Sequence, residues 1–325
     1  MTKAFTDDNR TVYRSTYRYL RWVMVAALVA LFLSVLIQSL MAGCWLGSVS
    51  AYYYTPARTV FVGALIVFGS ALIAYKGRAP EEDVALNFAG YMAIVVAMVP
   101  TTEDDLCPAS GFGQTKDAVG DAVLNNVWSL IGITAIALSL LLARWWLHDR
   151  KSVVSNAAPR ITRIRTRVVA VVCITVLVGE LWYFLVNPDF FMERSHGIAA
   201  ITMVAGLVGV MIFNASIVDH AAAVYRVGYW ALAALLVLLA GAVLLVSEPH
   251  LILFLELVVF GVFVAYWILQ SIEMWREPED FVQSPADSDG SGPLAGERAV
   301  PAATRGHQEH RQCSPPPVAC PPRVR

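Results

Sequence analysis

The chain of 325 residues has few charged side chains, 15% of the total, and its net charge is only −1. Soluble domains carry about 25% charged residues, so a water-exposed globule of this length would lack polar surface. The near-zero net charge offers no attraction to a polyanion, and we expect no nucleic-acid partner. Apolar residues are in excess, at 57%, which predicts that the chain folds in an apolar solvent.

The sequence also lacks the local motifs of common enzyme classes. It contains no phosphate-binding or dinucleotide-binding glycine loop and no His-Glu-x-x-His. A Gly-x-Ser-x-Gly nucleophile elbow is absent too. The six histidines are dispersed along the chain. We therefore expect no cofactor, and a protein without enzymatic activity is the first hypothesis.

Long apolar stretches dominate what is present. A bilayer core of about 30 Å needs about 20 mostly apolar residues in a helix. Eight stretches meet or approach this length, the second and third being the shortest; they are Leu20–Ala42, Thr59–Tyr75, Val84–Pro100, Val127–Leu147, Val168–Val186, Gly197–Ile217, Val227–Ser247 and Leu251–Glu273. The sequence therefore predicts an all-α, polytopic membrane bundle of about eight transmembrane helices.

Lysine and arginine predict the orientation of these helices. With the N-terminus inside, all but Arg58, Lys116 and Arg194 of the 24 basic residues fall on the inner side, as the positive-inside rule requires. Both termini are then cytoplasmic. We expect a cytoplasmic N-terminal segment at 1–19 and a transmembrane domain at 20–275. The tail at 276–325, rich in proline, glycine, serine and charge, should be disordered.

The outer loops of this topology contain two cysteines and a tyrosine run. A disulfide between Cys44 and Cys107 is chemically allowed in an oxidising exterior. It requires Cα atoms within about 7 Å, which the sequence leaves open. The run Tyr52–Tyr54 is typical of the aromatic belt at the level of the lipid headgroups.

Two glutamates inside predicted spans provide a candidate site. Glu180 and Glu256 each lie six residues from the outer end of a span, or about 9 Å deep at roughly 1.5 Å per residue. Arg58 and His196 lie near the same boundary. Ionisable groups at membrane depth usually mark a site or an ion pair. The four predict an outward-facing polar pocket that binds or moves a small ligand or lipid; structural pairing of each glutamate is the alternative.

Two other functions remain open at this stage. In a metal-assisted lipid hydrolase, His196 and His250 would be metal ligands, with Glu180 or Glu256 as oxygen ligands or acid–base groups. In a membrane scaffold, the cytoplasmic tail would recruit partners. Membrane lipids are expected neighbours in every case.

The segment from residue 44 to 102 resembles a known group of proteins. It contains Ser-Val-Ser-Ala-Tyr-Tyr-Tyr-Thr-Pro-Ala-Arg at 48–58, Asn-Phe-Ala-Gly at 87–90 and Val-Pro-Thr at 99–101. These resemble uncharacterised multi-pass membrane proteins common in actinobacteria. The resemblance implies a bacterial plasma membrane and no assigned activity. A more remote likeness is to membrane hydrolases of the alkaline ceramidase type, whose paired C-terminal histidines this chain lacks.

Overall fold

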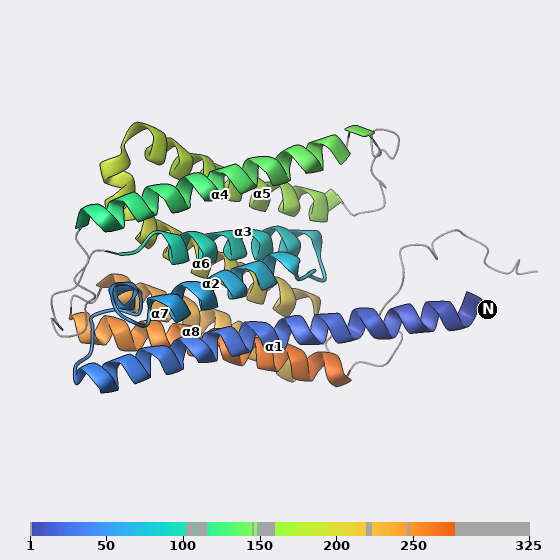
Figure 1. Ribbon diagram of the computed structural model, residues 1–325. Coiled ribbons are helices and arrows are strands. Elements are labelled where there is room, and N and C mark those ends of the chain that lie inside the picture. Colours follow the sequence, from blue (N-terminus) through green and yellow to red (C-terminus); the bar gives the residue numbers. More distant parts are fainter. Residues whose placement is uncertain are drawn as a thin grey trace, which may run out of the picture. The chain divides into compact units, whose positions relative to one another are not determined.

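The computed structural model describes residues 2–101, 107, 116–144, 146–147, 160–218, 223–245 and 248–276. Within these residues the chain is helical, and the all-α prediction is confirmed. Eight α-helices follow one another with a 3-10 helix after the first (Figure 1): α1 (Thr2–Ala42), η1 (Ser50–Tyr54), α2 (Arg58–Ala74), α3 (Pro80–Met98), α4 (Lys116–Arg144), α5 (Arg160–Val186), α6 (Pro188–Ile217), α7 (Ala223–Leu245) and α8 (Pro249–Arg276). The tail predicted from residue 276 onward lies outside the described residues, apart from Arg276 itself.

Six of the helices, α1 and α4 to α8, are long and apolar enough to cross a membrane. Their outward faces carry many exposed large apolar side chains, which lipid would solvate. The chain is therefore a multi-pass integral membrane protein. Of the two short predicted spans, α2 has 17 residues, and α3 begins with proline and three acidic residues, which suit the positive end of the helix dipole.

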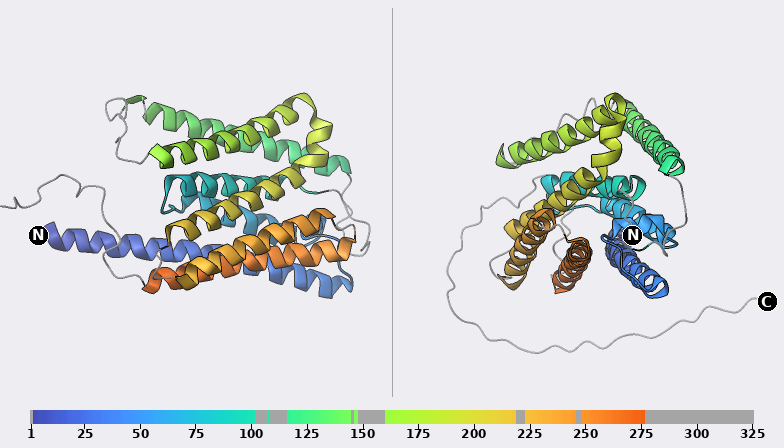
Figure 2. Two further views of the ribbon diagram at one scale, coloured as in Figure 1. Left: turned by 180° about the vertical axis from the view of Figure 1, so that it is seen from behind. Right: turned by 90° about the vertical axis from the view of Figure 1, so that its left-hand side faces the viewer.

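The two short helices form a central antiparallel hairpin. On one side α2 packs against α1, and on the other side α3 packs against α6. The pair α4 and α5 lies beyond α3, at the edge of the bundle (Figure 2). Gly69 of α2 and Gly90 of α3 meet where the two backbones cross: a Cβ built on Gly90 would lie 2.5 Å from the carbonyl oxygen of Gly69. Small residues at such crossings let membrane helices approach closely.

Two details go beyond the sequence-based expectations. Residues 2–19 continue the first predicted span as helix, because α1 runs unbroken from Thr2 to Ala42; hydropathy detects only the apolar part of such a helix. Tyr52 and Tyr53 are buried in η1 rather than forming an interfacial belt. The hydroxyl of Tyr52 lies 2.5 Å from the Ser39 hydroxyl of α1. This polar contact holds the η1 turn against α1.

The two ends of the bundle are distinct. At one end Cys44 and Cys107 form a disulfide, with Cα atoms 5.9 Å apart; we call this the disulfide end. The Tyr54 hydroxyl donates to the Thr101 carbonyl oxygen there, at 2.7 Å. These two links join the segment after α1 to the segment after α3. The other end, where α2 passes into α3, is called the opposite end.

Candidate functional site

A cavity of about 110 Å³ lies at the disulfide end, among α2, α3, α6, α7 and α8 and beneath the turn that leads into η1. Most of its wall is apolar, from side chains such as Leu65, Met203, Val243 and Phe260. Few polar groups line it, and none of the lining residues is lysine or arginine. Small-molecule sites in proteins have this mixture of a largely apolar wall and a few polar groups.

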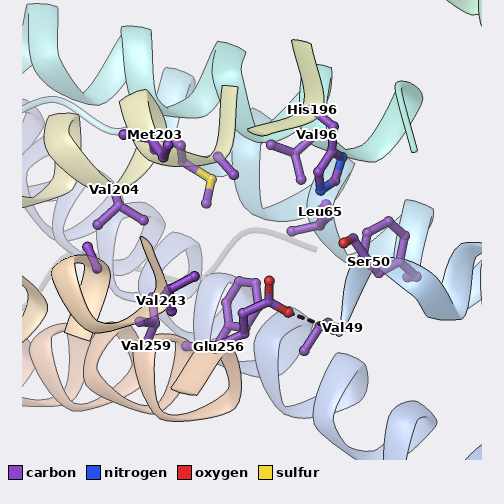
Figure 3. A pocket seen from close by; sticks show the side chains of 15 residues that line it. Val49, Ser50, Leu65, Val96, His196, Met203, Val204, Val243, Glu256 and Val259 are labelled. Atoms are coloured by element: carbon purple, nitrogen blue, oxygen red, sulfur yellow. Dashed lines mark hydrogen bonds between the residues drawn. The ribbon is translucent and has the colours of Figure 1, made fainter. Parts of the chain in front are cut away.

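Glu256 of α8 provides the carboxylate of the cavity (Figure 3). Its Oε2 accepts a hydrogen bond of 2.7 Å from the backbone N–H of Val49. Val49 is the N-cap of η1 and has no side chain able to cap it, so the glutamate satisfies a donor that the short helix leaves free. The other carboxylate oxygen points into the cavity (Figure 3).

His196, near the start of α6, faces the cavity across from Glu256 (Figure 3). Its Nδ1 lies 2.6 Å from the carbonyl oxygen of Val99. A carbonyl can only accept, so Nδ1 carries the proton and donates it. In the neutral ring Nε2 is then a hydrogen-bond acceptor. The contact with Val99 thus fixes both the orientation of the ring and the tautomer that it presents.

Ser50 is the third polar side chain in the wall. Its hydroxyl lies 3.1 Å from the hydroxyl of Ser48, which also accepts from the backbone N–H of Ala51 at 3.1 Å. The Ser50 hydroxyl can donate to Ser48, and its oxygen can then still accept a hydrogen bond from another group. The polar part of the wall therefore consists of groups able to accept hydrogen bonds.

Two of the four residues predicted for this site line the cavity, and two do not. Glu256 and His196 are brought together, whereas Glu180 and Arg58 are not among the lining residues. Glu180 of α5 lies near the Ser195 side chain, and its buried Oε2 has no partner in the part of the chain that the structure describes.

Arg58 remains at the edge of the η1 turn. Its Nη2 donates to the Tyr53 hydroxyl at 2.6 Å, and its guanidinium lies 4.1 Å from the centre of the same ring, within the range of a cation–π contact. Depth alone does not say which neighbour a helix face meets, and α5 packs against α3 and α6 from outside.

The histidines do not form the arrangement that a metal site would require. His250, at the start of α8, is exposed and does not line the cavity with His196. Among the described residues, no three histidine, cysteine, aspartate or glutamate side chains gather where they could hold a metal ion. The residues present therefore do not fit the zinc site of the hydrolase alternative.

A second polar cluster, at the opposite end, was not anticipated as a unit. Glu82 of α3 accepts from the Asn214 side chain of α6 at 2.7 Å, and from the backbone N–H of Arg78 at 2.7 Å. Asn214 also donates to the Tyr266 hydroxyl of α8 at 3.0 Å. Arg78 forms an ion pair of 3.0 Å with Glu273 of α8. One network thus ties the α2–α3 turn to α6 and α8.

The network continues towards α7 and α1. The Tyr229 hydroxyl of α7 donates to Glu273. Arg21 of α1, 4% exposed, donates to the Tyr75 hydroxyl at 2.6 Å. The Tyr75 hydroxyl is the acceptor in this bond. Buried polar networks favour one packing; this one joins the α2–α3 turn to α6, α7 and α8, and the bond between Arg21 and Tyr75 joins α1 to the same turn.

The sequence contained a signal for this cluster. An amide inside an apolar run predicts a hydrogen bond to a neighbouring helix; Asn214 forms one, whereas Asn87 is exposed on α3. The acidic residues that open α3 indicate by themselves only a favourable interaction with the helix dipole, and Glu273 stands at the end of a predicted span. Their pairing depends on α8 lying beside the α2–α3 turn, which no local pattern shows.

The comparisons with known proteins do not extend these observations. No protein family, no curated protein and no solved structure matches the chain. Function must therefore be argued from the site itself.

Proposed function

We propose that the chain crosses a bacterial plasma membrane eight times, with both termini cytoplasmic, and that the cavity at the disulfide end binds a small ligand from the outer side. The observation that carries the proposal is the pair Glu256 and His196, which face one cavity whose remaining wall is almost entirely apolar. Buried ionisable groups are costly at membrane depth. A ligand that uses them would account for both.

Two observations support the outward direction of the cavity. A disulfide persists in an oxidising compartment, and Cys44 and Cys107 are joined at the same end as the cavity. The basic residues of the loops favour the opposite end as the cytoplasmic one, where Lys76 and Arg78 lie between α2 and α3. In this orientation α2 and α3 complete the bundle as short spans, and membrane lipid covers the outer faces of α4 and α5.

The cavity volume limits the ligand. Protein cavities of roughly 150 Å³ hold a benzene molecule, so about 110 Å³ accommodates a body of about four or five heavy atoms. We expect such a molecule to have an apolar body and one polar head that meets Glu256 and His196. The geometry gives no support to the hydrolase alternative, and the scaffold alternative depends on the tail, outside the described residues.

Fluorine NMR of 3-fluoropropanol, which stays within this size limit, with the detergent-purified full-length protein tests the cavity. We expect the probe signal to broaden with the wild-type protein. Ala200 lines the cavity, and the variant Ala200→Phe should abolish the broadening by filling it. Ala205 lies on the same helix but is exposed, so Ala205→Phe is the matched control and should bind like the wild type. Equal binding of the probe by the wild type and both variants would contradict the proposal.

A further inference from the structure

The polar groups of the cavity also indicate the chemistry of the ligand's head group. We propose, on the basis of the function proposed above, that the cavity selects a primary ammonium group attached to a short apolar body. The argument uses three features: the side chains that face the cavity, the charge balance of its wall, and the hydrogen bonds that already occupy these side chains.

Glu256, His196 and Ser50 can each offer a hydrogen-bond acceptor to the cavity. The Glu256 Oε2 is engaged by the Val49 N–H, which leaves its second oxygen as an acceptor directed into the cavity (Figure 3). The His196 Nδ1 proton is engaged by the Val99 carbonyl oxygen, which leaves Nε2 as an acceptor. The Ser50 hydroxyl can donate to Ser48 and accept from a ligand. A primary ammonium has three N–H donors and could satisfy all three groups.

The charge of the wall favours a cation. Among the described residues, no lysine or arginine lines the cavity that Glu256 faces, and a carboxylate at membrane depth calls for a positive partner. An anionic head group would meet this carboxylate across a medium of low dielectric constant, where like charges repel strongly. A neutral alcohol could hydrogen-bond but would leave the charge uncompensated.

Other cations fit less well. A divalent metal ion needs several oxygen or nitrogen ligands in a closed shell, and the lining supplies one carboxylate and one imidazole. Quaternary ammonium groups are held by aromatic cages, whereas the aromatic carbocycles in the wall are only Phe61 and Phe260. The apolar remainder of the wall suits a hydrocarbon body, which a hydrated inorganic ion lacks.

Three probes of similar size, each small enough for the cavity, test the inference by fluorine NMR titration of the full-length protein: 3-fluoropropylamine, 3-fluoropropanol and fluoroacetate. Charge-assisted hydrogen bonds are markedly stronger than neutral ones, so the amine should bind more than about tenfold tighter than the alcohol. The carboxylate should bind least. If the alcohol binds as tightly as the amine, the ammonium inference is wrong while the cavity proposal stands. If none of the probes binds, the proposed function fails as well.

Two glutamine variants localise the effect. Glu256→Gln keeps an amide oxygen that can still accept from Val49, so we expect it to fold and to lose the preference for the amine. Glu180→Gln is the matched control, since Glu180 lies in a neighbouring span but outside the lining, and the preference should remain. The inference would be overturned if both variants lost the preference for the amine equally, or if neither variant lost it.

A free amine and the ammonium of an aminophospholipid share this chemistry. Nanodiscs of phosphatidylethanolamine and of phosphatidylcholine distinguish the two sources. If phosphatidylethanolamine displaces 3-fluoropropylamine and phosphatidylcholine does not, the ammonium belongs to a lipid. If neither lipid competes while the amine still binds through Glu256, the ligand is a free amine.

Discussion

Buried polar side chains at the opposite end differ in how many hydrogen bonds the protein itself supplies. Asn214 and Gln270 are both 0% exposed, yet Asn214 donates to Glu82 and Tyr266, whereas neither amide atom of Gln270 has a partner among the described residues. An unpaired buried polar group costs about 1–3 kcal/mol. The two amides should therefore respond differently to an apolar replacement.

We predict that Asn214→Leu destabilises the protein by about 1–3 kcal/mol, because it leaves the Glu82 carboxylate short of a donor. Gln270→Leu should leave the free energy of unfolding unchanged or raise it. Leucine has a similar volume and no polar atom that needs a hydrogen-bond partner. Unfolding free energies of both variants in mixed detergent micelles check this. An equal loss in the two variants would show that Gln270 is partnered by something other than the protein atoms described.

The ion pair of Arg78 and Glu273 should be far more sensitive to substitution than the one between Lys76 and Asp83. The Glu273 side chain is 3% exposed and that of Arg78 13%, so Arg78→Met leaves a buried carboxylate uncompensated, at a cost of about 3–5 kcal/mol. The Lys76 side chain is 67% exposed, and Lys76→Met should cost less than about 1 kcal/mol.

A double variant separates charge from packing in this comparison. Adding Glu273→Gln to Arg78→Met removes the uncompensated charge and should recover part of the lost unfolding free energy. Chemical unfolding of the wild type, Arg78→Met, Glu273→Gln and the double variant completes a double-mutant cycle. No recovery in the double variant would mean that Arg78 acts through contacts other than its pairing with Glu273.

At the scale of helices, the crossing of α2 and α3 depends on two glycines. A Cβ at Gly69 would meet the backbone carbonyl oxygen of Gly90, which cannot move away as a flexible side chain would. We therefore predict that Gly69→Ala lowers the thermal midpoint. Gly63, on the same helix, has no atom within 4 Å of an added Cβ, and Gly63→Ala should be neutral or slightly stabilising because alanine favours helix. Equal midpoints of the two variants would contradict the close crossing.

Helix positions could be read from the sequence because lipid requires long apolar runs. The apolar run at 20–42 and the helix Thr2–Ala42 share the same end, but the polar start of α1 has no hydropathy signal. The η1 turn was missed, since its tyrosines are held by contacts with distant residues such as Ser39. The local sequence pattern thus predicted the ends of the helices more reliably than the structure of the loops between them.

The candidate site could be predicted only in part, for a related reason. Glu256 and His196 were found because ionisable groups are rare in apolar runs, and both line the cavity. Glu180 has the same predicted depth as Glu256 but lies near Ser195 and outside the lining, because rotation about a helix axis and the choice of neighbour are set by packing. The network of Glu82 and Glu273 joins residues nearly two hundred positions apart (Arg78 to Glu273 spans 195), and periodicity has no information at that separation.

At the scale of the whole molecule, the orientation in the membrane determines whether the cavity meets the exterior. Arg194 at the disulfide end and Lys76 at the opposite end have side chains that are 63% and 67% exposed. Each can be replaced by cysteine in a chain whose three cysteines outside the disulfide are changed to serine. We predict that a membrane-impermeant maleimide labels Arg194→Cys in intact cells and leaves Lys76→Cys unlabelled, because only the former residue would lie outside.

Inverted membrane vesicles should reverse this pattern, since they expose the cytoplasmic face. The opposite labelling in both preparations would place the disulfide in the reducing cytoplasm, where such bonds are rarely kept, and would turn the cavity inward. An outward cavity draws its ligand from the surroundings of the cell, and an inward one from the cytoplasm. The accessibility of two exposed side chains therefore decides from which compartment Glu256 and His196 receive a ligand.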